Sequence, residues 1–126
     1  MAEPLKVMLV EDDIALRDIY QTRLTAEGFE VSVVADGEEA LTEALRIRPH
    51  LILLDLMMPK INGFDVLDIL KKTGETKDTK VIVLSALSDD NSQARAKELG
   101  ADEYIVKSQT SLSDVVDKIH RHLAHI

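Results

Sequence analysis

The sequence contains no cysteine, no long apolar run and no excess of basic residues. Without cysteine, disulfide bonds, thiolate metal sites and cysteine nucleophiles are excluded. No apolar stretch approaches the roughly 20 residues of a membrane-spanning helix. The segment from Met1 to Val10 also lacks the basic start and the cleavage site of a signal peptide. These absences predict a cytoplasmic protein that does not bind or cross a membrane.

Positive charge is in short supply, because 15 Lys and Arg residues stand against 23 Asp and Glu residues, for a formal net charge of −8. Nucleic acids and anionic membranes are bound by clustered Lys and Arg, so direct binding to nucleic acid is not expected. A chain of 126 residues can bury one core and is too short for two. We therefore predict a single domain over residues 1–126, with no output domain.

Four apolar residues, Leu51 to Leu54, lead directly into the carboxylate of Asp55. A continuous apolar run bounded by Pro49 and Pro59 is typical of a strand that is buried on both faces of a parallel sheet. Asp55 then stands at the carboxyl end of that strand. Open α/β sheets carry their ligand sites at this edge.

Strands and helices alternate five times along the chain. Strands are predicted over residues 5–10, 31–34, 51–54, 81–84 and 104–106, and helices begin at Ile14, after Asp36, past Gly63, at Ser88 and after Ser111. Such alternation predicts right-handed βαβ units and a parallel sheet covered on both faces. Five strands are too few for a closed barrel. The predicted fold class is therefore α/β, a doubly wound, flavodoxin-like sheet in the order 2-1-3-4-5 with five helices.

Local patterns add detail to this fold. The partly alternating strand at residues 31–34 is typical of a sheet edge. Asp36, with Glu39 three residues later, forms a capping-box pattern at the start of the second helix. The helix predicted over residues 88–99 has few apolar residues, so we expect it to pack weakly. Asp13 alone is best explained as the N-cap of the first helix.

Polar residues follow four of the predicted strands at the same edge of the sheet. They are Glu11 and Asp12 after the first strand, Asp55 after the third, Ser85 after the fourth and Lys107 after the fifth. Carboxylates at close range repel one another unless a cation lies among them. Oxygen ligands without His or Cys suit Mg²⁺. A hydroxyl and a lysine could hold an anion, so the set is typical of a phosphoryl site with a carboxylate nucleophile.

Each residue has an ordinary explanation when it is taken alone. Ser85 could be a loop hydroxyl, Lys107 a solvated surface charge and the acids helix caps. The convergence of all of them at one edge is what favours the phosphoryl site.

Four motifs carry a resemblance to a known family. They are Val10-Glu11-Asp12-Asp13, Leu54-Asp55-Leu56-Met57-Met58-Pro59 with Gly63, Leu84-Ser85-Ala86, and Gly100-Ala101-Asp102-Glu103-Tyr104 leading to Lys107. In this order and spacing, the whole chain resembles a receiver domain of the two-component response regulators, of the chemotaxis-receiver type.

The resemblance implies a phosphorylation-dependent signalling switch. Asp55 would accept a phosphoryl group from a histidine kinase or a phosphotransfer protein, and Ser85 and Lys107 would contact its oxygens. Mg²⁺ would be bound by Glu11, Asp12, Asp55 and the backbone carbonyl of Met57. The chain would act as a phosphoacceptor that assists its own phosphorylation, not as an enzyme.

The resemblance also implies how the signal is read. Tyr104 would point outward in the unphosphorylated protein and inward once Ser85 moves toward the phosphoryl group, although an edge-strand aromatic would look the same in sequence. The surface formed by residues 88–124 would bind a downstream protein target. The protein would be a monomer or a weak homodimer.

Two positions depart from the family pattern. Ser108 follows the site lysine, where the family usually has proline, so we expect the Lys107-Ser108 peptide bond to be trans. Lys60 stands where the family often has a small residue, and it is either a cation at the pocket mouth or a solvated loop lysine. Met57 and Leu87 beside the site are both apolar, which predicts slow autodephosphorylation because ordered water is excluded.

The sequence is also compatible with other functions. A docking module with the receiver fold would need no phosphorylation, but it would be expected to lack Asp55 or Lys107. An aspartyl-phosphate hydrolase generally needs a second acid two residues after the nucleophile, where this chain has Met57. His122 and His125 could suggest a metal site, although a solvated helix end is the better explanation.

Overall fold

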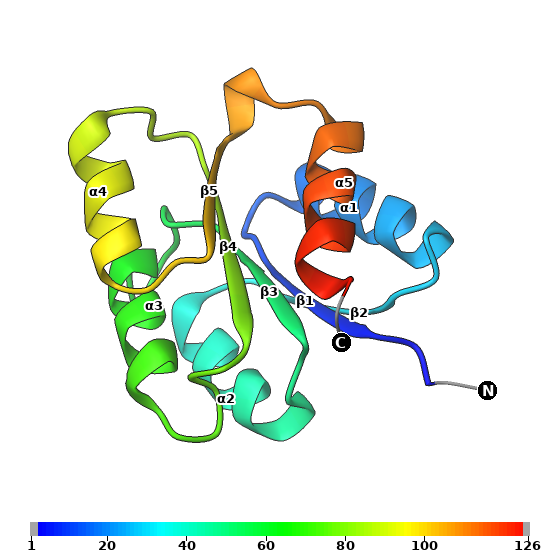
Figure 1. The fold of residues 1–126 in the computed structure, drawn as a ribbon, viewed down its shortest axis with the longest axis horizontal. Coiled ribbons are helices and arrows are strands. Elements are labelled where there is room, and N and C mark those ends of the chain that lie inside the picture. The colour runs from blue at the N-terminus through cyan, green and yellow to red at the C-terminus, as the bar shows by residue number, and fades with distance from the viewer. Residues whose placement is uncertain (1–2, 125–126) are drawn as a thin grey trace.

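The computed structural model describes residues 3–124 and contains one five-stranded parallel sheet in the order β2-β1-β3-β4-β5 (Figure 1). The strands are β1 (Lys6–Val10), β2 (Glu30–Val34), β3 (Leu51–Leu54), β4 (Lys80–Ser85) and β5 (Glu103–Val106). The helices are α1 (Ile14–Ala26), α2 (Gly37–Ile47), α3 (Gly63–Lys72), α4 (Asp90–Glu98), α5 (Leu112–Leu123) and the short 3₁₀ helix η1 (Lys107–Gln109). The predicted fold class and strand order are confirmed.

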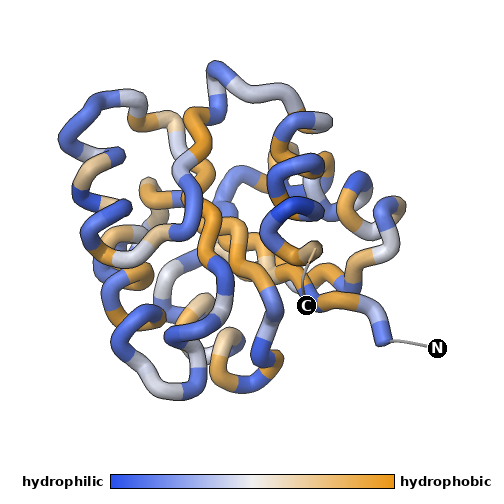
Figure 2. The backbone as a smooth tube through the Cα atoms, viewed as in Figure 1, coloured by the Kyte–Doolittle hydropathy of each residue, from blue (hydrophilic) through white to orange (hydrophobic). Residues whose placement is uncertain are grey.

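The helices cover both faces of the sheet and create two apolar cores. α1 and α5 pack on one face, and α2, α3 and α4 pack on the other (Figure 1). Leu9 faces α1 and α5, whereas its neighbours Met8 and Val10 face the opposite helices. Hydrophobic residues therefore run along the strands at the centre of the molecule (Figure 2). Burial on both faces explains why β3 is a continuous apolar run.

The strand at the sheet edge behaves differently from the central ones. β2 is half-buried over most of its length and pairs only with β1 among the described strands. The partly alternating pattern that predicted an edge strand is confirmed. Among the residues from 3 to 124, no helix is long and apolar enough to span a bilayer.

The helices begin close to the carboxyl edge of the sheet, and their N-terminal N–H groups are capped. The capping side chains, each accepting a backbone N–H three residues later, are Asp13, Asp36, Asn62, Asp89 and Ser111. The predicted caps at Asp13 and Asp36 are confirmed. α4 begins at Asp90, after the predicted start at Ser88, because Asp89 is its cap. Only Ala96 of α4 is buried, which confirms the weak packing face.

Gly63 lets α3 approach the end of β3 very closely. Its N–H donates to the Leu56 carbonyl at 3.0 Å, and a Cβ at this position would collide with backbone atoms of Leu56 and Asp55. Backbone atoms cannot move aside as the end of a flexible side chain can. The glycine is thus required by the geometry that places Asp55.

We predict that Gly63→Ala lowers the free energy of unfolding by about 1–3 kcal/mol, because the added methyl overpacks against backbone. Urea denaturation measures this. Gly74→Ala is the matched control, because a Cβ there meets nothing within 4 Å. If both variants unfold at the same urea concentration, the close approach at Gly63 is not what limits this position.

Candidate functional site

The register of the sheet explains why distant polar residues meet. Side chains alternate between the two faces along a strand, so a residue two positions on points to the same face. Leu9, Leu53 and Ile105 all belong to the core beneath α1 and α5. Two residues after each of them come Glu11, Asp55 and Lys107, listed here in the same order. These polar residues continue one face of the sheet past its carboxyl edge.

Lys107 forms the central contact of this site. Its Nζ lies 2.8 Å from Glu11 Oε1 and 3.2 Å from Asp55 Oδ2. Glu11 is 1% exposed and Asp55 is 5% exposed, so both carboxylates are withdrawn from solvent. Asp12 is exposed beside them. The structure therefore brings together four of the residues that the sequence singled out.

Burial and the neighbouring charges have opposite effects on the pKa values of Glu11 and Lys107. Burial raises the pKa of Glu11, and this effect outweighs the hydrogen bond from Lys107, which lowers it. Burial alone would lower the pKa of Lys107, but the hydrogen bond to Glu11 and the charge of Asp55 raise it above the ordinary value. Lys107 thus stays charged and offsets the repulsion between two buried carboxylates.

The acidic cluster has the composition of a site for a hard divalent cation. Glu11, Asp12 and Asp55 each offer a carboxylate oxygen, and these oxygens lie within 4.8 Å of one another. The cluster contains neither His nor Cys, and oxygen-only ligands are what Mg²⁺ prefers. The donor set fits that ion. The carbonyl of Met57 as a further ligand stays a prediction, although the Met57 N–H donates to Asp55 Oδ1 at 3.1 Å and so orients this carboxylate.

Ser85 and Tyr104 form a second group, connected through Leu87. The fully buried Ser85 Oγ accepts the Leu87 N–H at 3.1 Å. The Tyr104 hydroxyl donates to the Leu87 carbonyl at 2.8 Å. The half-buried Tyr104 ring packs against the core of the α2, α3 and α4 face. The bond to Leu87 holds the ring against this core. The role of Tyr104 as a switch that points outward before phosphorylation and inward after it stays a prediction.

The loop after Lys107 contains Ser108 at the position where the family usually has proline. The described residues contain no cis peptide bond, so the Lys107-Ser108 bond is trans, as predicted. The chain continues in η1, a turn that the sequence did not indicate.

Lys60 lies in the loop before α3, in a left-handed conformation with φ of 70°. Its ammonium lies 3.5 Å from Asp36 Oδ2, at the N-cap of α2. It is therefore paired rather than freely solvated, and its partner is not one of the carboxylates of the acidic cluster.

The histidines of α5 face carboxylates. His120 Nε2 lies 2.8 Å from Glu27 Oε1, and His122 Nε2 lies 2.7 Å from Glu103 Oε1. His125, the other half of the metal alternative, lies outside the described residues. The described histidines of this helix anchor it to the end of α1 and to β5.

Comparisons with known proteins agree with this geometry. A model of the response regulator receiver domain family matches residues 7–120. The chain is 45% identical over 102 residues to a probable transcriptional regulator, ycf27, of Porphyridium aerugineum, a match that covers 81% of this chain and 41% of that protein. The chain thus spans about two fifths of the length of the curated relatives that it matches first.

Solved structures share the same architecture. A CheY-like receiver domain protein of Methanospirillum hungatei superposes with a TM-score of 0.90 at 26% identity, covering 97% of this chain and 95% of that one. The Mn²⁺-bound form of the response regulator Rcp1 gives a TM-score of 0.81 at 29% identity, covering 93% and 92%.

We predict that Lys107→Met lowers the free energy of unfolding by about 2–3 kcal/mol, because it leaves two buried carboxylates without a counter-charge. Chemical denaturation at neutral pH measures the loss. Lys72→Met is the matched control: its ammonium pairs with Asp68, but its side chain is 76% exposed, and such pairs contribute about 0–1 kcal/mol. Equal losses in the two variants would contradict the central role of Lys107.

Proposed function

The chain belongs to the response regulator receiver domain family of two-component signalling, and from this premise we propose that it is a switch that accepts a phosphoryl group on Asp55. The observation that carries the proposal is the Lys107 ammonium, which contacts both Glu11 and Asp55. An ammonium in this position can contact the Asp55 carboxylate before the transfer and a phosphoryl oxygen after it. The donor would be a histidine kinase or a phosphotransfer protein.

The residues around Asp55 prepare its carboxylate for attack. Oδ1 accepts the Met57 N–H and Oδ2 faces Lys107, so the carboxylate has a fixed orientation. One of its oxygens would form the bond to phosphorus while the bond from phosphorus to the donor nitrogen breaks. Lys107 would then contact a phosphoryl oxygen, and the Ser85 hydroxyl would donate a hydrogen bond to another.

A divalent cation supports this transfer. Glu11, Asp12, Asp55 and the Met57 carbonyl would hold Mg²⁺, which when bound supplies positive charge that offsets the charge of the transferring group. The Mn²⁺-bound form of the response regulator Rcp1 supports the binding of a divalent cation by a protein of this fold.

The hydrogen bonds of Leu87 would connect the phosphoryl group to the surface. Ser85, Leu87 and Tyr104 are joined in one series of bonds. A shift of Ser85 toward a phosphoryl oxygen would therefore act on the Tyr104 ring. We propose that the surface of residues 88–124, formed by α4, β5 and α5, binds the downstream protein target in response.

Two alternatives are less well supported. For an aspartyl-phosphate hydrolase, the position of the second acid is occupied by Met57, whose apolar side chain is 56% exposed. A docking module that needs no phosphorylation would not require a buried carboxylate at Asp55 with a lysine beside it, and this chain has both. Phosphorylation by a small phosphoryl donor separates the switch from the docking module.

We expect the protein to gain one phosphoryl group in mass when it is incubated with phosphoramidate and Mg²⁺, and to gain none when EDTA is added. Asp55→Asn should remove the gain, because it removes the nucleophile. Asp68→Asn is the control, because Asp68 lies on α3 and pairs with Lys72 at the surface. A folded wild-type protein that binds Mg²⁺ but gains no mass would favour the docking module.

We further propose that the phosphoryl group is long-lived, because the side chains flanking the site are the apolar Met57 and Leu87. Met57→Asn and Leu87→Glu together should shorten the lifetime severalfold, since polar side chains there can order the attacking water. Decay of the phosphorylated mass with time measures this. Leu45→Glu, an exposed position on α2, is the control. An unchanged lifetime in the double variant would contradict the proposal that Met57 and Leu87 make the phosphoryl group long-lived.

A further inference from the structure

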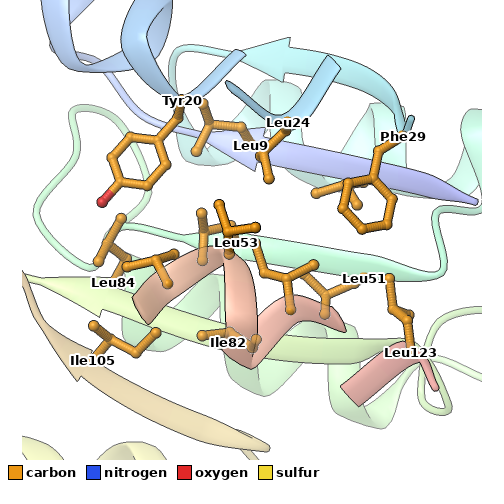
Figure 3. Packing of buried hydrophobic residues seen from close by; sticks show 14 residues of the cluster. Leu9, Tyr20, Leu24, Phe29, Leu51, Leu53, Ile82, Leu84, Ile105 and Leu123 are labelled. Carbon is orange, nitrogen blue, oxygen red and sulfur yellow. The ribbon is translucent and has the colours of Figure 1, made fainter. Parts of the chain in front are cut away.

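Tyr20 is a buried aromatic residue for which the proposed function has no use. It lies on α1, is 6% exposed and belongs to the apolar core beneath α1 and α5. Figure 3 shows its ring at one end of that core, with the hydroxyl pointing away from Leu24 and Phe29.

The hydroxyl of Tyr20 forms no hydrogen bond with any described residue. A phenol hydroxyl that is buried among leucines usually has a partner, because an unpaired one costs free energy. No side-chain oxygen or nitrogen that is sealed from solvent lacks a partner in the part of the chain from 3 to 124. The Tyr20 hydroxyl must therefore open onto solvent at the margin of the core.

The position of Tyr20 indicates what lies at that margin. Its core partners include Leu9, Leu53 and Ile105, the residues two positions before Glu11, Asp55 and Lys107. The acidic pocket thus continues the same face of the sheet. Burial raises the pKa of Tyr20, and the charges of Lys107, which lowers it, and of Glu11, which raises it, have smaller effects.

Lys107 has one more N–H group than it has acceptors among the described residues. Its ammonium carries three N–H groups, of which one donates to Glu11 and one to Asp55. Within the described residues, the remaining N–H has no acceptor. An unpaired hydroxyl and an unpaired ammonium N–H therefore occur on one face of the sheet.

We propose that Tyr20 is a positioning residue for Lys107: a bridging water accepts the remaining N–H of the ammonium and donates to the oxygen of the Tyr20 hydroxyl. Water-mediated bonds of this kind are nearly as favourable as direct ones. The bridge fixes the ammonium beside Asp55. This matters in a chain whose lysine is followed by Ser108, because a serine backbone restricts the loop less than a proline.

The proposal rests on the proposed phosphorylation of Asp55 for its effect on rate, but its structural part can be tested separately. In Tyr20→Phe, phosphorylation by phosphoramidate should slow about three- to tenfold, the range expected from one hydrogen bond. The ring remains, so the apolar packing around position 20 should be kept and the variant should fold as the wild type does. A packing role alone would leave this rate unchanged.

Phe29→Leu is the matched control for the rate. Phe29 is an aromatic of the same core, 8% exposed, at the opposite end of the cluster (Figure 3). This variant should lose stability and keep the wild-type rate. A rate in Tyr20→Phe within twofold of wild type would overturn the proposal.

A second measurement needs no phosphoryl donor. The ¹³Cε signal of Lys107, assigned by its loss in Lys107→Arg, should shift in Tyr20→Phe and stay in place in Phe29→Leu. Phenylalanine keeps the ring current, so the shift reports the hydroxyl. If the wild type is never phosphorylated, the proposed function fails and this signal alone decides: a shift supports the bridge, and an unmoved signal overturns it.

Discussion

The buried carboxylates of Glu11 and Asp55 repel each other, and the Lys107 ammonium is the group that offsets this repulsion. Glu11 and Lys107 are 96 residues apart in sequence, so their contact exists only because β1, β3 and β5 are parallel and end at one edge. The contact also requires that these three strands, which occupy different places in the sheet, end at the same height along it. The site is thus a consequence of the topology as much as of the residues.

The candidate site is divided between the two faces of the sheet. Glu11, Asp55 and Lys107 continue the face of α1 and α5, whereas Tyr104 packs with the core of α2, α3 and α4. Ser85 and Leu87 lie between these groups through the hydrogen bonds of the Leu87 backbone. A change at Asp55 must therefore cross the sheet edge to reach Tyr104, and the described hydrogen bonds provide one route.

Much of the fold was predictable because its signals are local. The unbroken apolar run before Asp55, bounded by two prolines, favours a doubly buried strand. Asp13 and Asp36 cap helices through bonds to residues three positions away. Features that depend on distant contacts were not predictable. The Lys60 pair with Asp36, the η1 turn and the bond from Tyr104 to the Leu87 carbonyl depend on which segments meet in space. Tyr20 has no signal at all, because a buried tyrosine and a buried leucine fit the same helical pattern.

The surface of residues 88–124 is unevenly anchored. On α5, Lys118 and His122 both contact Glu103 of β5, and His120 contacts Glu27. Burial alone would raise the pKa of Glu103, but these two partners lower it, so the carboxylate stays charged and the anchor holds at neutral pH. α4 buries only Ala96. A displacement that begins at Ser85 and Leu87 would therefore break few buried contacts of α4. Within the surface of residues 88–124, this helix is the element that can move at the lowest cost in free energy.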